Sequence, residues 1–320
     1  MKALTFSSFG GPEVLEYTDV PNPVLKPNEI LVKMEAIGLN FADIYRRKGN
    51  YHLKGEPPYI AGYEGAGIIV DTNGHENFRS FDRVGFADVP HANTELVAVP
   101  ISHVIPLPDE ISTETAASVL LQGLTAQYLA ADSHVIKLAE TVVIHAAAGG
   151  VGQILTQIAK YSGAKVIGLT TSKAKEAFIK ELGADHVLNL NNNWLQQIID
   201  ITEGKGVDVV YDSIGSTLAD SLNVTRVGGT VVFYGMSGGN PALVDPRLLM
   251  DGSKTLTGGD LWSYLTSHSE RLKRSAELFD WISIGVIKLS APIKFKLSEG
   301  KDAHKYLESG KSAGKIILIP

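Results

Sequence analysis

A glycine-rich turn at residues 141–152, TVVIHAAAGGVG, constrains the fold of this chain more than any other stretch. It opens with Val142, Val143 and Ile144, a β-branched run too short for a helix, and from Val151 the apolar residues resume with helical spacing. A strand, a small-residue turn and a helix in this order predict a dinucleotide site, because the backbone can approach a pyrophosphate and the helix start offers free N–H groups. The alternative is a tight turn that binds nothing. The three small positions of the pattern are held by Ala147, Gly149 and Gly152.

Composition narrows the class of protein. At 320 residues the chain exceeds the usual limit of a single core, so two domains are expected. Its net charge of −6, with no run of Lys or Arg, argues against nucleic acid or an anionic membrane as the main partner. No apolar stretch is long enough for a membrane span and the N-terminus does not read as a signal peptide, so the expected location is the cytoplasm. The absence of cysteine excludes disulfides, zinc–thiolate sites and thiol catalysis.

The two halves of the chain differ in composition and in expected secondary structure. Residues up to about 120 are rich in proline and strand-like runs, with strands expected at 30–37 and 62–70 and a short helix at 40–48. From residue 112 helices and strands alternate, which predicts a parallel sheet with right-handed crossovers. The last strand resembles the first half, so the C-terminus is expected to rejoin the N-terminal domain. The expected helices are 113–131, 151–161, 173–182, 194–202, 218–224 and 269–284, and the expected strands are 141–147, 165–170, 187–190, 207–214, 230–235, 254–257 and 315–319.

The end of the second strand of this alternating region bears on which dinucleotide binds. An NAD-binding unit usually carries Asp or Glu there to hold the ribose 2′-OH. Here the strand is followed by Thr171, Ser172, Lys173 and Lys175, with no acid at its tip. Hydroxyls and lysines would hold a 2′-phosphate, so electrostatics favours NADPH over NADH. The alternative for the two lysines is a solvated helix start.

Three motifs in order carry a resemblance to a known family. They are Gly38-Leu39-Asn40-Phe41-Ala42-Asp43, Gly62-Tyr63-Glu64-Gly65-Ala66-Gly67 and the Ala-Ala-Gly-Gly-Val-Gly turn. Together they resemble the medium-chain dehydrogenase/reductase superfamily, and the chain is most similar to its zinc-independent quinone oxidoreductase, or zeta-crystallin-like, branch from GGPEVLEY to GKIILIP. The resemblance implies an α/β fold, with a Rossmann doubly wound parallel sheet at 123–263 inserted in a β-rich GroES-like catalytic domain at 1–122 and 264–320.

The motifs also imply a site without metal. Zinc-dependent members carry a Cys and a His where this chain has Asn40 and Tyr63, and residues 120–125 contain neither ligand. Amide and phenol oxygens without a thiolate do not hold Zn²⁺. Reduction of an ordinary ketone needs a Lewis acid or a strong donor, whereas a quinone or an α,β-unsaturated carbonyl yields a delocalised anion that modest donors stabilise.

Tyr45 and Asn40 are the candidate catalytic donors, because the resemblance places them near the nicotinamide. A neutral tyrosine donates a hydrogen bond readily at neutral pH. The alternatives are that Tyr45 packs on the core and that Asn40 caps the end of a strand. Asp43 is interpreted as structural, orienting the neighbouring backbone or Arg46 and Arg47.

The resemblance further implies cofactor-binding residues, with Thr125 beside the nicotinamide. Leu190, after Asn189, stands where close relatives have a Tyr beside the adenosine, which weakens the expected adenine contacts, and Gln122 stands where some relatives have Lys. His145 is interpreted as a satisfied core or groove residue, not a catalytic base. The residues expected at the pyrophosphate are Ala148, Gly149, Gly150, Val151 and Gly152; those at the 2′-phosphate are Thr171, Ser172 and Lys175; and those lining the groove are Ser213, Gly235, Met236 and Ser237.

Three functions remain open on the sequence. The first is an NADPH-dependent quinone reductase, and the second is an enoyl or enone reductase on the same scaffold. The third is a nucleotide-sensing or RNA-binding protein with residual activity, against which the acidic balance and the lack of basic stripes argue. A homodimer is expected, because an open doubly wound sheet leaves an edge strand to be covered and similar enzymes pair through that domain.

Overall fold

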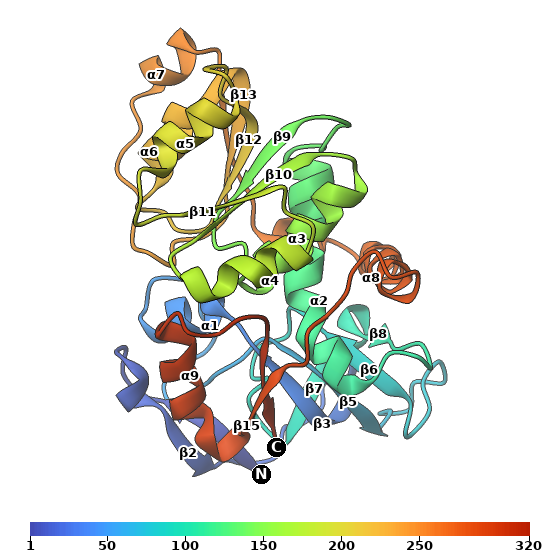
Figure 1. Cartoon of the computed structure of the whole chain (residues 1–320). Helices are drawn as coiled ribbons and strands as arrows, with labels where there is room; N and C mark the ends of the chain where they lie inside the picture. Colours follow the sequence, from blue (N-terminus) through green and yellow to red (C-terminus); the bar gives the residue numbers. More distant parts are fainter. The chain divides into compact units, whose positions relative to one another are not determined.

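The computed structural model describes all 320 residues, and its internal contacts divide the chain into two units (Figure 1). The first unit comprises Met1–Leu121, Leu265–Phe279 and Ser290–Pro320, and the second comprises Gln122–Tyr264 and Asp280–Leu289. The sequence predicts one domain at 1–122 with 264–320 and another at 123–263. The division by contacts defines compact units and not folding domains, so these domains stay a prediction. The main difference is that residues 280–289 belong to the second unit.

The second unit is built on a six-stranded sheet in which every pairing is parallel. The strand order is β11-β10-β9-β12-β13-β14, so the direction of winding reverses between β9 and β12. Ligands of such sheets bind beyond the carboxyl ends of the strands near that reversal. The strands are β9 (Thr141–Ile144), β10 (Lys165–Thr170), β11 (His186–Asn189), β12 (Val207–Asp212), β13 (Thr225–Phe233) and β14 (Thr255–Gly258).

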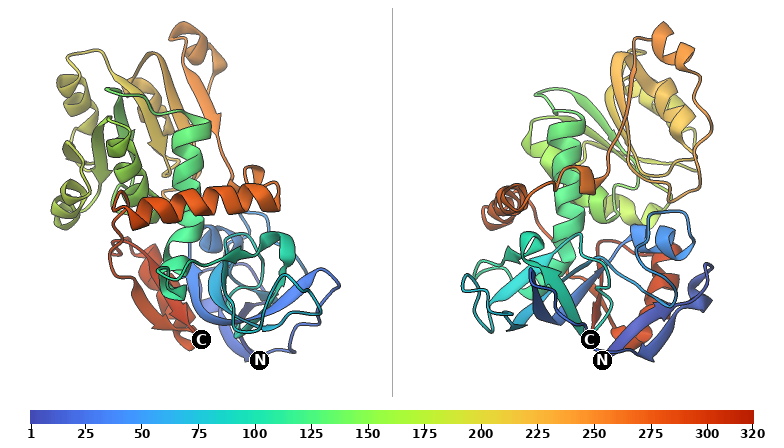
Figure 2. Two further views of the ribbon diagram at one scale, coloured as in Figure 1. Left: turned by 90° about the vertical axis from the view of Figure 1, so that its right-hand side faces the viewer. Right: turned by 180° about the vertical axis from the view of Figure 1, so that it is seen from behind.

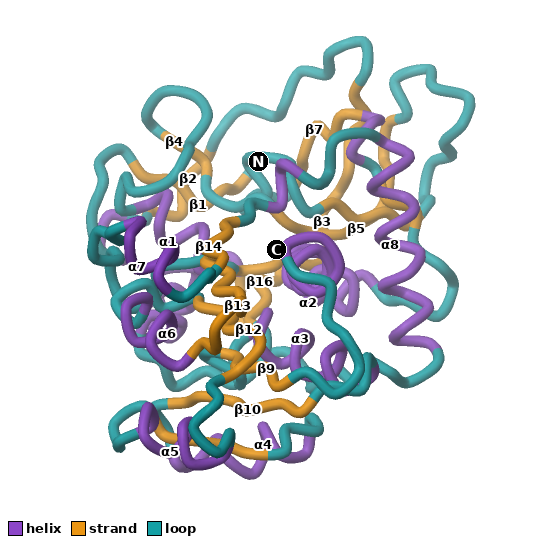
Figure 3. The backbone as a smooth tube through the Cα atoms, turned by 90° about the horizontal axis from the view of Figure 1, so that it is seen from above, coloured by secondary structure: helices purple, strands orange, loops and turns teal.

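Helices cover both faces of this sheet. Viewed from above, α5 and α6 lie on one side of the strands, and α3 and α4 lie on the other (Figure 3). The β-branched runs of the strands are buried between them, with Val143, Ile167 and Val210 fully enclosed. The helices are α3 (Gly150–Tyr161), α4 (Glu176–Glu181), α5 (Trp194–Ile201), α6 (Leu218–Val224) and α7 (Pro246–Asp251), with 3-10 turns at Lys173–Lys175 and Leu261–Ser263 and a π-helical turn at Leu129–Ser133.

The first unit is β-rich. A seven-stranded sheet has the order β15-β16-β3-β5-β6-β8, with β7 also paired to β3, and a three-stranded sheet has the order β2-β1-β4. The C-terminal strand β16 pairs antiparallel with β3, which confirms that the C-terminus returns to the N-terminal region, and the two chain ends lie near each other (Figure 2). The strands are β1 (Lys2–Phe6), β2 (Glu16–Asp19), β3 (Glu29–Leu39), β4 (Tyr59–Ile60), β5 (Glu64–Asp71), β6 (Arg83–Phe86), β7 (Leu96–Pro100), β8 (Ile105–Pro106), β15 (Ile293–Lys296) and β16 (Ile316–Ile319).

Four α-helices accompany these sheets. α1 (Phe41–Arg47) and α9 (Gly300–Glu308) belong to the first unit, whereas α2 (Thr113–Tyr128) and α8 (His268–Ser283) contribute residues to both units. Three 3-10 turns complete the unit, at Pro12–Val14, Ile101–His103 and Leu297–Glu299.

The structure corrects one expected strand and changes the helix type along two expected helices. The strand expected at 141–147 ends at Ile144, because Ala146 adopts a left-handed φ of 48° that turns the chain out of the sheet. The helix expected at 173–182 begins as a 3-10 turn, and only Glu176–Glu181 is α-helical. The helix expected at 113–131 ends at Tyr128 and continues as a π-helical turn.

Candidate active site

The turn after β9 forms a cradle of backbone. Gly149 is the N-cap of α3, no side chain caps this helix, and its first three N–H groups have no intrahelical acceptor. A Cβ on Gly152 would overlap the carbonyl oxygen of Ala146, and one on Gly150 would overlap the side chain of Gln122. Only glycine therefore fits at Gly152, where the obstacle is backbone, whereas at Gly150 the Gln122 side chain would have to move. A cradle of free amides at the positive end of a twelve-residue helix fits a pyrophosphate.

The residues after β10 form a short basic turn. Ser172 is the N-cap of the 3-10 turn, and its N–H donates to Thr170 Oγ1 at 3.1 Å, while Thr171 lies exposed with its carbonyl accepting from Asn191 Nδ2 at 3.2 Å. Lys175 is half-buried, and this burial lowers the pKa of its ammonium. A phosphate beside a partly desolvated ammonium stabilises the charged form. Lys175 therefore fits the predicted 2′-phosphate contact.

The ends of β12 and β13 meet at the same edge of the sheet. Ser237 donates from both its N–H and its hydroxyl to the carbonyl oxygen of Ser213, at 3.0 Å each. Gly235 lies directly beside Ser213, and Met236 follows it, half-buried, just past the end of β13. The structure thus brings the predicted groove residues together at the carboxyl edge, where the α3 turn and the basic turn also lie. Thr125 is buried on the part of α2 that belongs to the second unit.

His145 follows β9 and is fully buried. Its Nε2 lies 3.0 Å from Ser221 Oγ, and that hydroxyl donates to Asp212 Oδ2 at 2.7 Å. The prediction of a core residue is confirmed, but the ring is satisfied on one side only, because Nδ1 has no hydrogen-bond partner. Burial lowers the pKa of His145, which keeps the ring neutral. Leu190 lies partly buried against the same core.

In the first unit, Asn40 and Tyr45 sit at the start and in the middle of α1. Asn40 is the N-cap residue, and Tyr45 is half-buried with its ring 6.1 Å from that of Phe41 and 6.3 Å from that of Tyr51. The buried Arg46 guanidinium lies over the Tyr63 ring at 3.7 Å. The two predicted donors therefore belong to the first unit, and the predicted cofactor residues all belong to the second.

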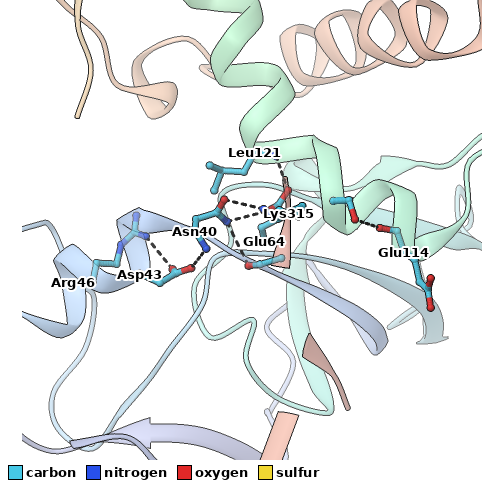
Figure 4. A network of polar contacts seen from close by, with 9 residues as sticks. Asn40, Asp43, Arg46, Glu64, Glu114, Leu121 and Lys315 are labelled. Carbon is cyan, nitrogen blue, oxygen red and sulfur yellow. Dashed lines mark hydrogen bonds and ion pairs between the residues drawn. The ribbon is translucent and has the colours of Figure 1, made fainter. Parts of the chain in front are cut away.

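A buried polar network surrounds Asn40 (Figure 4). Lys315 Nζ donates to Glu64 Oε2 at 2.6 Å and to Asn40 Oδ1 at 2.8 Å, and Asn40 Nδ2 donates to Glu64 Oε2 at 2.8 Å. The other carboxylate oxygen of Glu64 accepts the Leu121 N–H of α2 at 2.7 Å. Neither Glu64 nor Lys315 is predicted as a site residue from the sequence. The available signal was weak: an acid inside the second glycine motif, and a single lysine before the apolar run of the last strand.

Asp43 has the structural role that the sequence predicted. Its Oδ2 accepts the Asn40 N–H at 2.9 Å, and its Oδ1 lies 3.4 Å from Arg46 Nη1. Burial raises the pKa of Asp43, and the charge of Arg46 opposes that rise. The part of the prediction that concerned Arg47 is wrong, because its side chain turns instead toward α9 and pairs with Glu308 at 2.8 Å.

The whole chain contains no group of three or more His, Cys, Asp or Glu side chains that could hold a metal ion. None of its helices combines the length and the apolar character that crossing a membrane requires.

Comparison with known proteins agrees with this geometry. A model of the alcohol dehydrogenase GroES-like domain matches residues 26–140, and a model of the zinc-binding dehydrogenase family matches residues 150–280. Quinone oxidoreductase 1 of Escherichia coli is 37% identical over 324 residues, with 99% of each chain covered. The chain belongs to the quinone oxidoreductase branch of the medium-chain dehydrogenase/reductase superfamily.

Solved structures of this superfamily share the fold over the whole chain. The crystal structure of Escherichia coli quinone oxidoreductase complexed with NADPH has a TM-score of 0.96 and 36% identity, with 100% of each chain covered. A 2-haloacrylate reductase of Burkholderia is 36% identical, with 97% of this chain and 96% of the relative covered. The second unit is thus the Rossmann part of a medium-chain dehydrogenase/reductase, and the first is its GroES-like part.

Proposed function

We propose that this chain is an NADPH-dependent, zinc-independent reductase that transfers hydride to a quinone. The observation that carries the proposal is the α3 turn, where Gly150 and Gly152 leave a cradle for a pyrophosphate at the edge of a Rossmann sheet. The half-buried ammonium of Lys175 supports NADPH, and so do the NADPH complexes among similar structures. Full-length similarity to quinone oxidoreductases of several organisms supports the quinone.

Different residues of this chain bind the cofactor and assist the reduction of the acceptor. When bound, NADPH supplies the hydride; the amides of Gly150, Val151 and Gly152 hold its pyrophosphate, and Lys175 holds its 2′-phosphate. Tyr45 donates a hydrogen bond to the acceptor oxygen as negative charge develops there, which favours the transition state. A quinone suits such modest assistance because its reduction yields a delocalised phenolate.

The side chains around Asn40 and Tyr63 support independence from zinc. The oxygen of the Asn40 amide faces the Lys315 ammonium, and the face of the Tyr63 ring is covered by the Arg46 guanidinium. Two cations already neighbour the positions at which zinc-dependent relatives carry ligands. Each of these cations is paired with a carboxylate, Glu64 or Asp43, and a divalent cation there would find no thiolate or imidazole.

The test is loss of NADPH absorbance in the presence of 1,4-benzoquinone or 9,10-phenanthrenequinone. Turnover that persists after treatment with a metal chelator is expected. Absence of turnover across a panel of quinones would reject the proposal.

A second candidate is reduction of an α,β-unsaturated carbonyl, and the similar 2-haloacrylate reductase favours it. Hydride addition to such a substrate gives an enolate that the same donor would stabilise. Faster NADPH consumption with 2-haloacrylate or 2-alkenals than with quinones would decide for this candidate.

Further proposals concern organisation and partners. We propose the two domains expected above, a homodimer that forms through the edge strand β14, and a location in the cytoplasm. The net charge of −6 supports the expectation that no nucleic acid binds. RNA binding in a filter assay without any reductase activity would instead favour the nucleotide-sensing alternative.

A further inference from the structure

Lys315 and Glu64 have no role in the hydride transfer proposed so far. The Lys315 side chain is 3% exposed and its partner Glu64 is fully buried. Lysine and glutamate are rarely buried so deeply, because removing both charges from water costs more than their attraction returns unless the geometry is tightly satisfied. Such a pair is weak evidence for stability. It indicates that the side chains around it have to be held in one arrangement.

The pair fixes the orientation of the Asn40 side chain (Figure 4). An ammonium only donates hydrogen bonds, and an ionised carboxylate only accepts them. The amide oxygen of Asn40 must therefore face Lys315, and its amide nitrogen must face Glu64, as the 2.8 Å contacts record. With either charged partner gone, the amide could rotate.

The hydrogen-bond network that orients Asn40 also includes residues of two helices. Asn40 begins α1, its N–H is held by Asp43, and the same helix carries Tyr45. Glu64 also accepts the Leu121 N–H, which lies inside α2. Lys315 thus ties the first turn of α1 to β5, to β16 and to α2 through buried hydrogen bonds.

We propose that Lys315 is a positioning residue for the reaction: through Asn40 it sets the place of α1 and so of the Tyr45 hydroxyl. This inference rests on the proposed function, in which Tyr45 donates to the acceptor. In this proposal Lys315 acts through Asn40, and no proton moves through it.

The first test compares Lys315→Met with the wild type and with Lys294→Met. Lys294 is a matched control, because its Nζ also lies 2.7 Å from a carboxylate, that of Glu114, but on the surface. We expect Lys315→Met to lower kcat with 1,4-benzoquinone at least tenfold while the Kd for NADPH, measured by fluorescence titration, stays within twofold. Lys294→Met should change neither. A folded Lys315→Met enzyme with wild-type kcat would overturn the proposal.

A double variant separates positioning from stability. Lys315→Met leaves the buried carboxylate of Glu64 without its cation, which lowers the Tm and can prevent folding. The Lys315→Met/Glu64→Gln variant removes both charges and keeps both shapes, so its Tm should return toward that of the wild type while kcat stays low. Recovery of kcat together with Tm would show that the pair is purely structural.

An NMR readout keeps this inference distinct from the proposed function. If the wild type reduces neither quinones nor enones, the proposed function fails, and the side-chain amide resonance of Asn40 still tests the arrangement. In the double variant this resonance should shift and lose its protection from hydrogen exchange, and in Lys294→Met it should not. An unchanged Asn40 resonance in the double variant would overturn the proposal.

Discussion

At Gly152 a single methyl group decides whether the α3 turn closes. A Cβ there would overlap the carbonyl oxygen of Ala146 and lie 2.9 Å from the Cα of Ala147, and both obstacles are backbone atoms. Gly152→Ala must therefore open the turn, at a cost of about 1–3 kcal/mol as for other overpacked sites. We expect a lower Tm and an NADPH Kd raised at least tenfold in a fluorescence titration. Gly258→Ala is the control, because its Cβ would meet only Phe233 O, at 3.6 Å, and equal effects in both variants would contradict the prediction.

Lys175 should determine the preference for NADPH over NADH. Loss of a charge-assisted hydrogen bond costs about 1.5–3 kcal/mol, so Lys175→Met should weaken NADPH binding by about tenfold to a hundredfold. Affinity for NADH, which lacks the 2′-phosphate, should not change. Lys173→Met is the matched control, because Lys173 lies on the same turn but is exposed. An equal loss of NADH affinity would show that Lys175 acts on the fold of the turn instead.

Residues that act through local chain geometry could be predicted, and those that act through distant pairing could not. Gly149 and Gly152 lie within four positions of each other, so their spacing alone indicates the turn. Glu64 and Lys315 are 251 positions apart, and only the pairing of β16 with β3 and of β3 with β5 brings them together. Their two charges give no sign in the sequence of lying side by side.

At the scale of elements, the burial pattern of each helix or strand determined whether it could be predicted from the sequence. The bounds of β10 and α6 agree with the predictions, because β10 is a continuous buried run and the buried residues of α6 repeat with the helical period. α7 was missed because its six residues bury none of their side chains, so no such period exists. α9 was also missed, since two of its three buried residues, Gly300 and His304, are not types that mark an apolar face.

The packing of α9 against α1 should make stability depend on pH. His304 is fully buried on α9 and its Nδ1 lies 3.0 Å from Arg47 NH1; burial first, and then the Arg47 charge, lower the pKa of His304 to about 3, while the charge of Glu308 opposes this. In the unfolded chain the ring titrates near the ordinary value of about 6.5. Protons therefore bind the unfolded chain preferentially, and the stability contribution is lost as pH falls from about 6.5 toward 3, by about 2 kcal/mol at pH 5.

The measurement is the free energy of urea unfolding at pH 7 and pH 5. His304→Gln keeps an acceptor for Arg47 but cannot titrate, so we expect it to lose less stability than the wild type between these two pH values. His186→Gln, at a partly exposed histidine of the second unit, should keep the wild-type dependence. A His304→Gln variant with the full wild-type loss would contradict the assignment.

At the scale of the whole molecule, the β14 edge of the Rossmann sheet is the surface at which we expect a second copy of the chain to bind. β14 is one of the two end strands in the sheet order, so its outer edge pairs with no further strand of this chain. Beside it, the Gly228 N–H donates to the Gly252 carbonyl at 3.0 Å, which brings the start of β13 to the end of α7. Three apolar side chains are exposed there, Val227 at 71%, Leu248 at 61% and Met250 at 71%. An apolar patch beside an unpaired edge strand is typical of an interface.

We expect light scattering to give the mass of a dimer for the wild type and of a monomer for Leu248→Glu/Met250→Glu, because two carboxylates buried in the interface would lose their hydration without gaining a partner. Both substitutions lie on exposed positions of α7, so the circular dichroism of the monomer should match that of the wild type. Val24→Glu is the matched control, since Val24 is an 89% exposed apolar residue of the first unit, and it should leave the dimer intact. A wild-type monomer would refute the homodimer, and a double variant that still dimerises would place the partner surface elsewhere than α7 and β14.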